Sequence, residues 1–434
     1  MYDIIIIGAG IAGLNSARLL KEKYPDKKMC ILEKTNRIGG LVDTRFYNVS
    51  QKKRTLGQNK TQKIRKKRIK YEAGGAVVYE YQKNMLELIN KFNIEMREIP
   101  LGKNKRHFKN YYDGKKRKHP LQKETTEKYM TLLKKVFAFM DTKTDDYCRK
   151  YTLEQMCLQV LSFDETRFIE FCYGYASEFR VGNSVVTRKN MENELLNSNK
   201  MFIFTKGYHT LIQAIYNSIK EDVELFKNSE IMSFYKAKDI YVLKMRNGST
   251  YKTKQLVFAV PKEGLLKLCN SFEEKELEMF NSVESFSLSR IFAKYDMTKP
   301  ENKWIHKFKH STINNPIRQI IPVSKKHGFM QISYSDWYFA DYWGTLDEKK
   351  IKPILRKLLQ ENLQYDKIID PVYLKRVYWK NAVHYWNVNV NEKNMYKKIM
   401  HMRKNLFIVG ESFSLNQCWC EGPVQTSIDL LKIM

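Results

Sequence analysis

The chain has 434 residues, of which 43% are hydrophobic and 13% aromatic, enough for two or three domains with sizeable cores. No apolar run reaches the roughly 18 residues that a membrane-spanning helix needs, and the apolar start is too short for a signal peptide. The seven cysteines are odd in number and mostly scattered, which is typical of reduced thiols rather than a disulfide framework. We therefore expect an intracellular protein, cytoplasmic or nuclear. The close pair Cys418 and Cys420 lacks further ligands nearby, so we expect no metal site.

The formal net charge of +30 is extreme. Positive residues are densest in Lys52–Lys70, which contains no acid, and in Lys103–His119, where Asp113 is the one acid. Such stretches favour binding to nucleic acid, another polyanion or an acidic partner, or a nuclear address. They are equally typical of solvated loops in a lysine-rich chain, so both interpretations stay open.

The chain begins with a predicted dinucleotide-binding turn. Tyr2–Ile7 is almost wholly apolar and predicts a buried strand, and Ile11–Leu20 predicts a helix. Between and within them stand Gly8, Gly10 and Gly13 in the spacing G-x-G-x-x-G. The first glycine permits the tight turn, the second lets the backbone approach a pyrophosphate, and the third lets helix and strand pack closely. The helix N-terminus would then hold the pyrophosphate.

An acidic residue completes this fingerprint. Met29–Leu32 predicts a second strand, which ends at Glu33 at the spacing that the fingerprint requires. A carboxylate there accepts hydrogen bonds from ribose hydroxyls and repels a 2′-phosphate. These residues predict a dinucleotide site but leave open whether it holds NAD or FAD.

The rest of the chain alternates predicted helices and strands. A further strand and glycine turn are expected in the segment KYEAGGAVVY, which contains Gly74, Gly75 and Ala76. We expect helices over Lys83–Phe92, most of Thr125–Phe171, Ile351–Leu363 and Pro423–Leu431, a turn and helix over Phe202–Ile219, and strands over Glu224–Met232, Asp239–Met245, Gln255–Val260, Phe286–Tyr295, Ile317–Tyr334 and Asn405–Val409. Asn247-Gly248 predicts a hairpin turn.

Three segments make the chain resemble the flavin-containing amine oxidase superfamily, which includes monoamine and polyamine oxidases, L-amino-acid oxidases and protoporphyrinogen oxidase. They are EKTNRIGG from Glu33 to Gly40, KTKQLVFAVP from Lys252 to Pro261, and LFIVGESFSLNQCWCEGPVQTS from Leu406 to Ser427. The resemblance implies FAD rather than NAD. It also implies an α/β fold with a Rossmann-like FAD-binding domain (1–80, 202–262 and 402–434, with a basic insertion at 50–70). An α+β substrate domain (81–201 and 263–401) would be interleaved with it.

The resemblance also implies which residues hold the cofactor. Glu411 would hydrogen-bond the ribityl or phosphate region, and Pro423 would open the last helix at its first position, with the positive helix end facing the flavin. Ile231 matches the position whose backbone holds the adenine, although an ordinary buried isoleucine explains it nearly as well. No cysteine precedes Trp386 in the position used for covalent attachment, so we expect non-covalent FAD. The candidate cofactor-binding residues are Gly8, Gly10, Ala12, Gly13, Glu33, Arg37, Gly39, Gly40, Gly74, Gly75, Ala76, Ile231, Gly410, Glu411, Cys420 and Val424.

Six residues are candidates for the chemistry. The family has a lysine that holds a water near flavin N5, and Lys267 or Arg290 could stand for it, although arginine could only orient the water. Trp419 matches one wall of an aromatic cage, and Tyr385 or Trp386 could supply the other; for each, core packing is the alternative. His384 could transfer a proton or be a satisfied buried histidine.

The resemblance implies an FAD-dependent oxidase that takes hydride from a C–H bond next to an amine nitrogen, with oxygen reoxidising the flavin. The strongly positive chain would repel a polyamine at long range, so a neutral or anionic small-molecule substrate stays open. The alternatives are a related FAD enzyme, such as a protoporphyrinogen-type oxidase, desaturase or sugar-nucleotide mutase, and a basic flavoprotein with a structural role on nucleic acid.

Overall fold

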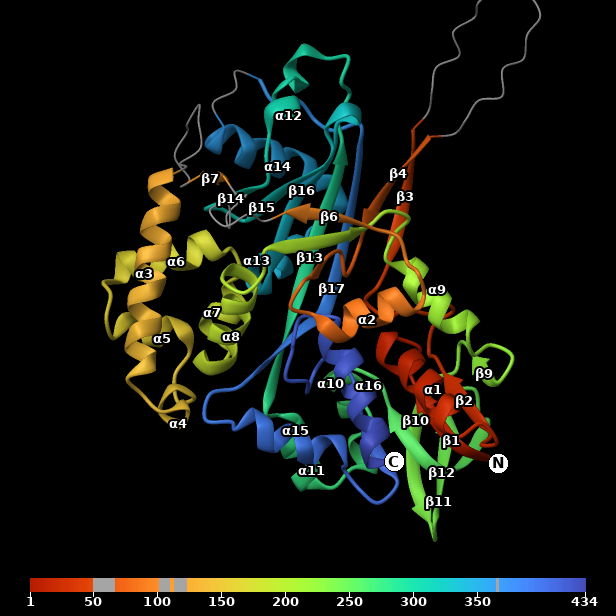
Figure 1. Cartoon of the computed structure of the whole chain (residues 1–434). Helices are drawn as coiled ribbons and strands as arrows, with labels where there is room; N and C mark the ends of the chain where they lie inside the picture. The colour runs from red at the N-terminus through yellow and green to blue at the C-terminus, as the bar shows by residue number, and fades with distance from the viewer. Residues whose placement is uncertain (50–66, 101–109, 113–122, 364–366) are drawn as a thin grey trace, which may run out of the picture.

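The computed structural model describes residues 1–49, 67–100, 110–112, 123–363 and 367–434 (Figure 1). Its first sheet is the predicted nucleotide-binding sheet. The strand order is β10-β11-β12-β1-β2-β9, and β18 pairs with β12 beyond the end of β11. The strands are β1 (Tyr2–Ile7), β2 (Met29–Leu32), β9 (Val223–Phe226), β10 (Ile231–Ala237), β11 (Ile240–Met245), β12 (Thr250–Phe258) and β18 (Leu406–Ile408). Three segments far apart in the chain therefore build one sheet.

Helices cover both faces of this sheet, because its central strands are apolar on both sides. Ile4 and Ile6 face a core shared with α1, α2, α9 and α16, whereas Ile5 and Ile7 face a core shared with α10, α11 and α15. The bounds are α1 (Ile11–Lys23), α2 (Lys83–Lys91), α9 (His209–Asn217), α10 (Lys262–Leu266), α11 (Glu274–Phe280), α15 (Glu392–Met400) and α16 (Glu421–Ile433). β1, β2, β9, β12 and β18 pair in parallel, as a Rossmann-like unit requires.

A second sheet has the order β17-β13-β16-β15-β14-β7 and carries helices α12, α13 and α14 around its core (Figure 1). The bounds are β7 (Asn110–Tyr112), β13 (Val283–Lys294), β14 (Ser311–Ile313), β15 (Gln319–Ser324), β16 (Phe329–Asp336), β17 (Tyr373–Trp386), α12 (Trp304–Lys307), α13 (Trp337–Thr345) and α14 (Glu348–Asn362). Val283 and Trp386, at paired ends of the long strands β13 and β17, lie in the core of the first sheet. These strands therefore join the two sheets.

The remaining elements form a helical group and two small sheets. The helices α3 to α8 share a core of their own at the left of Figure 1. The bounds are α3 (Lys123–Asp141), α4 (Asp145–Cys148), α5 (Leu153–Leu158), α6 (Phe163–Tyr173), α7 (Ala176–Arg180), α8 (Ser184–Leu195), β3 (Thr44–Val49), β4 (Lys67–Glu72), β5 (Val78–Tyr79), β6 (Met96–Pro100) and β8 (Lys200–Phe204). β3 pairs with β4, and β8 pairs with both β5 and β6.

The α/β class is confirmed, and most predicted elements form, including the hairpin turn at Asn247-Gly248. Four expectations were wrong in detail. Glu224–Met232 is two strands, because the chain turns at Asn228, whose φ is +53°. Ile317–Tyr334 is also two strands, separated by a turn at Gly328 with φ +62°.

The other two errors concern helix and strand starts. The segment Phe202–Ile219 begins with the end of strand β8, not with a turn. The last helix begins at Glu421, so Pro423 occupies its third position rather than its first. Proline is still tolerated there, because the first-turn N–H groups have no partner within the helix.

The two basic stretches fall largely outside the described residues. Only Lys67–Lys70 of the first stretch is described, and it lies in strand β4 rather than in a loop. In the second stretch only Asn110–Tyr112 is described, as β7. Within the described part of the chain, no helix combines the length and apolarity needed to cross a membrane.

Candidate functional site

The opening glycines differ in what surrounds them. A Cβ on Gly8 would lie 2.5 Å from the Ala259 carbonyl oxygen, and one on Gly13 would lie 1.9 Å from the Gly8 carbonyl oxygen. Packing alone therefore demands glycine at both positions. A Cβ on Gly10 would have only the Gly40 Cα, at 4.0 Å, among the described atoms nearby. Gly10 is also the N-cap of α1 and offers no side-chain cap to the helix. An open space therefore lies at the positive end of α1.

The second glycine loop forms the other wall of this space. Gly39 bridges to Gly10, and its N–H donates to the Ala9 carbonyl at 2.8 Å. The Arg37 guanidinium donates to the carbonyls of Gly40 at 2.5 Å and Val42 at 3.0 Å. Arg37 thus folds the loop through its own backbone. Gly39 and Gly40 have positive φ angles of +105° and +57°, which favour glycine at both positions.

Glu33 lies at the edge of the same space and is 8% exposed. Its carboxylate accepts hydrogen bonds from the Ala9 N–H at 2.9 Å and from the N–H and hydroxyl of Thr35 at 2.9 and 2.8 Å. A carboxylate has about four lone-pair sites, so one is left for a ligand. Ile231, at the start of β10, packs against the core on the other face of the sheet.

The Gly74-Gly75 segment packs on the second glycine loop. A Cβ on Gly74 would lie 1.6 Å from the Leu41 carbonyl oxygen, and the Gly75 N–H donates to that oxygen at 3.1 Å. A Cβ on Gly75 would contact the Cys420 Sγ at 3.6 Å. The closing segment of the chain therefore lies beside the opening loops. Ala76 follows as a half-buried residue.

Helix α16 is tied to the opening elements by polar contacts as well. The Asn15 side chain donates to the Ser427 hydroxyl at 2.7 Å, and the Glu421 carboxylate accepts from the backbone N–H groups of Asn84 and Met85 at 3.2 and 2.9 Å. Glu421 thus caps α2. Ala12 and Val424 are buried in the core between α1 and α16. Two chain ends that are far apart in sequence meet here.

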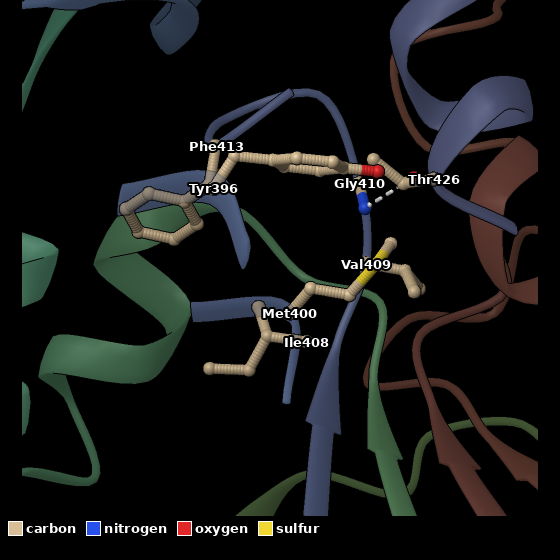
Figure 2. A pocket seen from close by; sticks show the side chains of 7 residues that line it. All are labelled: Tyr396, Met400, Ile408, Val409, Gly410, Phe413 and Thr426. Carbon is tan, nitrogen blue, oxygen red and sulfur yellow. Dashed lines mark hydrogen bonds between the residues drawn. The ribbon is translucent and has the colours of Figure 1, made fainter. Parts of the chain in front are cut away.

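Gly410 follows strand β18 in an open turn (Figure 2). Its φ is +132°, and a Cβ there would meet no described atom within 4 Å. Its N–H donates to the Thr426 hydroxyl at 3.0 Å, as Figure 2 shows. A narrow apolar gap adjoins this turn, lined by Tyr396, Met400, Ile408, Val409, Gly410, Phe413 and Thr426.

The next residue, Glu411, belongs to a buried charge cluster. Its carboxylate lies 2.5 Å from the Nδ1 of His384 and accepts from the Cys418 N–H at 2.7 Å. The Nε2 of His384 faces the Ser412 hydroxyl at 3.2 Å and the Glu263 carboxylate at 3.5 Å. Burial opposes the charged imidazole, but the charge of Glu411 and the hydrogen bond to Glu263 raise the pKa of His384 to about 9. Sequence reasoning missed Glu263, because nothing in the sequence places α10 beside β17.

Arg290 and Trp379 hold the segment before Gly74. The Arg290 guanidinium donates to the Glu72 carbonyl at 2.9 Å and lies 4.6 Å from the ring centre of Tyr334. The Trp379 indole donates to the Ala73 carbonyl at 2.8 Å. Arg290 therefore lies beside the candidate cofactor segment.

Lys267 is exposed at the end of α10, and within the described part of the chain no hydrogen bond or ion pair joins its side chain to the other candidates. The buried lysine of this region is Lys262, whose Nζ donates to the Val283 carbonyl at 2.6 Å. Sequence reasoning missed Lys262 because the chain contains so many lysines.

Aromatic side chains gather on the same side as Trp419. The half-buried Trp419 ring meets Tyr79 edge-to-face at 5.2 Å, and Tyr79 stacks on Tyr81 at 6.1 Å. The ring centres of Tyr175 and Tyr334 lie 5.7 Å apart. Tyr79, Tyr81, Tyr175 and Tyr334 were not among the predicted site residues. The signal for Tyr79 was present, since it closes the KYEAGGAVVY segment.

The two predicted partners of Trp419 are both buried. Trp386 is 0% exposed, packs on Phe413, and donates from its indole to the Ser414 carbonyl. Because the Trp386 ring has no exposed face, it packs in the core and is not available as a wall of the cage. Tyr385 is 4% exposed and lies 5.8 Å from Phe286 between ring centres. Among the described residues, the ring that contacts Trp419 is that of Tyr79.

Two acidic side chains, Glu194 and Glu178, lie near these aromatic rings in spite of the net positive charge of the chain. Burial is the main cause that raises the pKa of both Tyr79 and Tyr81, and the negative charge of Glu194 is the second cause. Glu178 accepts from the Tyr173 hydroxyl at 2.5 Å and the Asn190 amide at 2.8 Å. Burial outweighs these hydrogen bonds and raises the pKa of Glu178 to about 7. Glu194 therefore opposes, at the aromatic group, the net positive charge of the chain.

A family comparison decides what this site belongs to. The family of flavin containing amine oxidoreductases matches residues 11–429, which is nearly the whole chain. The chain belongs to this family. It is a flavin-dependent oxidoreductase, and the resemblance stated from the three sequence motifs is confirmed.

Individual relatives of this flavin amine oxidoreductase are distant. Amine oxidase [flavin-containing] A from Equus caballus is 29% identical over 100 residues, which cover 23% of this chain and 15% of that protein. Protein R188 of Acanthamoeba polyphaga mimivirus is 20% identical over 494 aligned residues, covering 99% of this chain and 93% of that one. A double mutant of putrescine oxidase, from a structure-based redesign of cofactor binding, superposes with a TM-score of 0.74. That match has 11% identity over 100% of this chain and 98% of the other, so it shows the shared fold.

The residues of the flavin amine oxidoreductase fit a dinucleotide. Gly10 and Gly40 leave a space that a larger residue would fill, and the uncapped N-terminus of α1 faces it. Glu33 keeps a lone pair at its edge, and the turn at Gly410 leaves a second opening. These observations make the flavin cofactor of the family compatible with this chain.

Proposed function

We propose that the chain binds FAD without a covalent bond and oxidises a small amine-type substrate, with oxygen as acceptor. The observation that carries the proposal is the meeting of the opening glycine loops, the Gly74-Gly75 segment and the closing segment at Cys420. The predicted domains, 1–80 with 202–262 and 402–434 against 81–201 with 263–401, remain part of this proposal.

The chain's residues would divide the binding between them. The backbone at Gly10 and Gly40 would bind the pyrophosphate, and Glu33 would bind the ribose. Arg290, next to Glu72, would orient a water or substrate group, since a guanidinium does not give up its proton. Trp419 and Tyr79 would bound the substrate and exclude water. The chemistry that bound FAD supplies is acceptance of a hydride from the substrate, followed by reoxidation by O2.

The acids near the aromatic group support an amine. Glu194 places negative charge beside Tyr79 and Tyr81, although the chain as a whole carries +30. Glu178, whose pKa is raised to about 7, adds full negative charge beside Tyr81 only above neutral pH. Aromatic faces and nearby carboxylates together favour a cation. Salt screens the long-range repulsion beyond about 10 Å, so the local groups decide the bound state.

The variant Gly10→Ala tests the proposal. The φ of Gly10 is −72°, and an added Cβ would lie 4.0 Å from its nearest described neighbour, so the variant is expected to fold. The methyl group would fill the pyrophosphate space, so we expect the wild type to be yellow and the variant to bind FAD at least about tenfold more weakly. Denaturation of the wild type should release the flavin, and anaerobic bleaching by amines should identify the substrate.

A matched control is Asn247→Ala, at the exposed hairpin turn away from the site. It should bind FAD as the wild type does. A colourless wild type that does not take up added FAD would overturn the proposal. Bleaching by porphyrinogens but not amines, or no oxygen consumption, would assign the alternative chemistries.

A further inference from the structure

His384 is a buried histidine that faces the closing segment of the chain. It is 1% exposed and lies near the end of β17. Its Nδ1 faces Glu411 at 2.5 Å, and its Nε2 faces both Ser412 at 3.2 Å and Glu263 at 3.5 Å. Both ring nitrogens thus face a carboxylate. A neutral imidazole has only one N–H, so this arrangement favours the doubly protonated ring.

The serine, histidine and glutamate have the connectivity of a nucleophilic triad, but they cannot act as one. Ser412 is 2% exposed, and its hydroxyl oxygen accepts a hydrogen bond from the backbone N–H of Lys262 at 3.2 Å. The carboxylate of Glu263 stabilises a proton on the Nε2 of His384. A general base needs that nitrogen unprotonated, so that it can take the proton of the serine hydroxyl. His384 is therefore not a base for Ser412.

The same contacts connect three segments of the chain. Glu411 and Ser412 belong to the closing loop, residues 410–420; Glu263 belongs to α10; and His384 belongs to β17. The Glu411 carboxylate also accepts the backbone N–H groups of Cys418 and His384, at 2.7 and 3.3 Å. Residues 411 and 412 at the start of the loop contact the imidazole of His384 directly, and Cys418 near its end is held to it through Glu411.

A neutral side chain supports the loop from within. Gln417 donates to the Ser412 carbonyl at 2.6 Å and accepts from the Trp386 N–H at 2.9 Å. Gly410, which bonds to Thr426 of α16, and Trp419, which contacts Tyr79, stand at the two ends of this fastened segment. Loss of the imidazole charge would leave the half-buried Glu411 carboxylate without its cation, which is costly.

The charged and titratable groups around His384 come from three elements. They are Glu263 and Lys262 on α10 and Glu411 and Cys418 in the closing loop, and the Ser285 hydroxyl on β13 lies near Glu263. Although burial opposes ionisation, the hydrogen bond and charge of His384 lower the pKa of Glu263 to about 2. Glu263 therefore stays charged wherever the protein is folded at ordinary pH.

We propose that His384 is a cationic positioning residue that clamps the closing loop to β17 and α10, and so shapes the flavin pocket at Gly410 and the aromatic wall at Trp419. The inference rests on the proposed flavin function. Below neutral pH the clamp is intact, and it opens as the imidazole loses its proton at alkaline pH.

The first test does not need the cofactor. Nitrogen NMR of protein labelled at its eight histidines should show one imidazole that stays doubly protonated at pH 8 and disappears in His384→Asn. The exposed His306 supplies the matched control, because His306→Asn should leave that signal unchanged. If the His384 imidazole is neutral at pH 7, the inference is overturned.

The second test measures FAD affinity by flavin fluorescence between pH 7 and 10. We expect the wild type to lose about tenfold in affinity over this range, and His384→Asn to be about tenfold weaker at pH 7 with no further loss. Glu263→Gln, which keeps the shape but removes a charge, should move the transition to lower pH by about one unit.

These outcomes separate the two proposals. A wild type that binds no FAD refutes the proposed function. A wild type that binds FAD, together with a His384→Asn variant that binds it equally well at every pH, refutes the clamp. If His384→Asn does not fold, the wild-type and Glu263→Gln pH profiles still decide.

Discussion

The opening and closing regions hold the same candidate pocket in different ways. The opening region, from Gly8 to Gly40, is shaped by absent side chains and by backbone hydrogen bonds, and its charged side chains Glu33 and Arg37 bind backbone groups rather than each other. The closing loop, residues 410–420, is shaped by charged side chains around His384. Backbone geometry does not titrate, whereas an ion cluster does. The first region should therefore respond to added volume and the second to pH and to lost charge.

The largest effect should come from Trp386→Ala. Trp386 is fully buried and holds the closing loop through the Ser414 carbonyl, so its removal should cost about 3–5 kcal/mol of unfolding free energy. Trp419→Ala, at a half-buried ring, should cost less than half as much but slow substrate oxidation. Urea unfolding and turnover measure the two effects. Equal stability losses would contradict the assignment of Trp386 to the core.

The pH dependence of stability should come next. His384 has a pKa of about 9 in the folded chain against 6.5 ordinarily. Its stabilisation, on the order of 3 kcal/mol, is complete below about pH 6.5 and is lost as the pH rises through 9. Thermal melts should show a steeper decline from pH 7 to 10 for the wild type than for His384→Asn. Parallel curves would mean that the cluster does not carry this charge.

A smaller loss should follow Gly13→Ala in the opening region. The added Cβ would lie 1.9 Å from the Gly8 carbonyl oxygen, so backbone must move, at a cost of about 1–3 kcal/mol. The loss should be the same at pH 6 and pH 9, because no charge is involved. Gly10→Ala should lose flavin with little loss of stability in the flavin-free protein. A pH-dependent loss in Gly13→Ala would remove the contrast between the regions.

The smallest effect should come from Lys267→Met. Lys267 is exposed at the end of α10, so neither flavin reduction nor reoxidation should change. Arg290→Met removes the donor to the Glu72 carbonyl and should slow at least one half-reaction, by roughly tenfold or more. Stopped-flow absorbance separates the half-reactions. A slow Lys267→Met variant would return that lysine to the candidate site.

Local patterns in the chain predicted most of the opening region. The strand Tyr2–Ile7, the glycine spacing and Glu33 all appear where expected, because neighbours in sequence determine a tight turn. The closing motif also predicted a strand, a loop and a helix, although the helix begins at Glu421. The two split strands escaped prediction, because turns at Asn228 and Gly328 interrupt otherwise apolar runs.

The catalytic candidates depended on contacts that the sequence does not contain. Trp386 and Trp419 are both tryptophans in aromatic-rich segments, yet one is core and the other is half-buried. Glu263 and His384 are 121 residues apart and meet because α10 packs against the end of β17. Lys262 and Lys267 stand five positions apart in a chain rich in lysine, and only burial tells them apart.

The sequence by itself determined the dinucleotide turn, the α/β class and the family, since these reside in short runs whose spacing is read directly. Only the tertiary structure decided which side chains enclose the pocket, which carry a shifted pKa, and which merely fill the core. Those properties follow from burial and from distances between segments far apart in the chain, because desolvation and Coulomb attraction act through space.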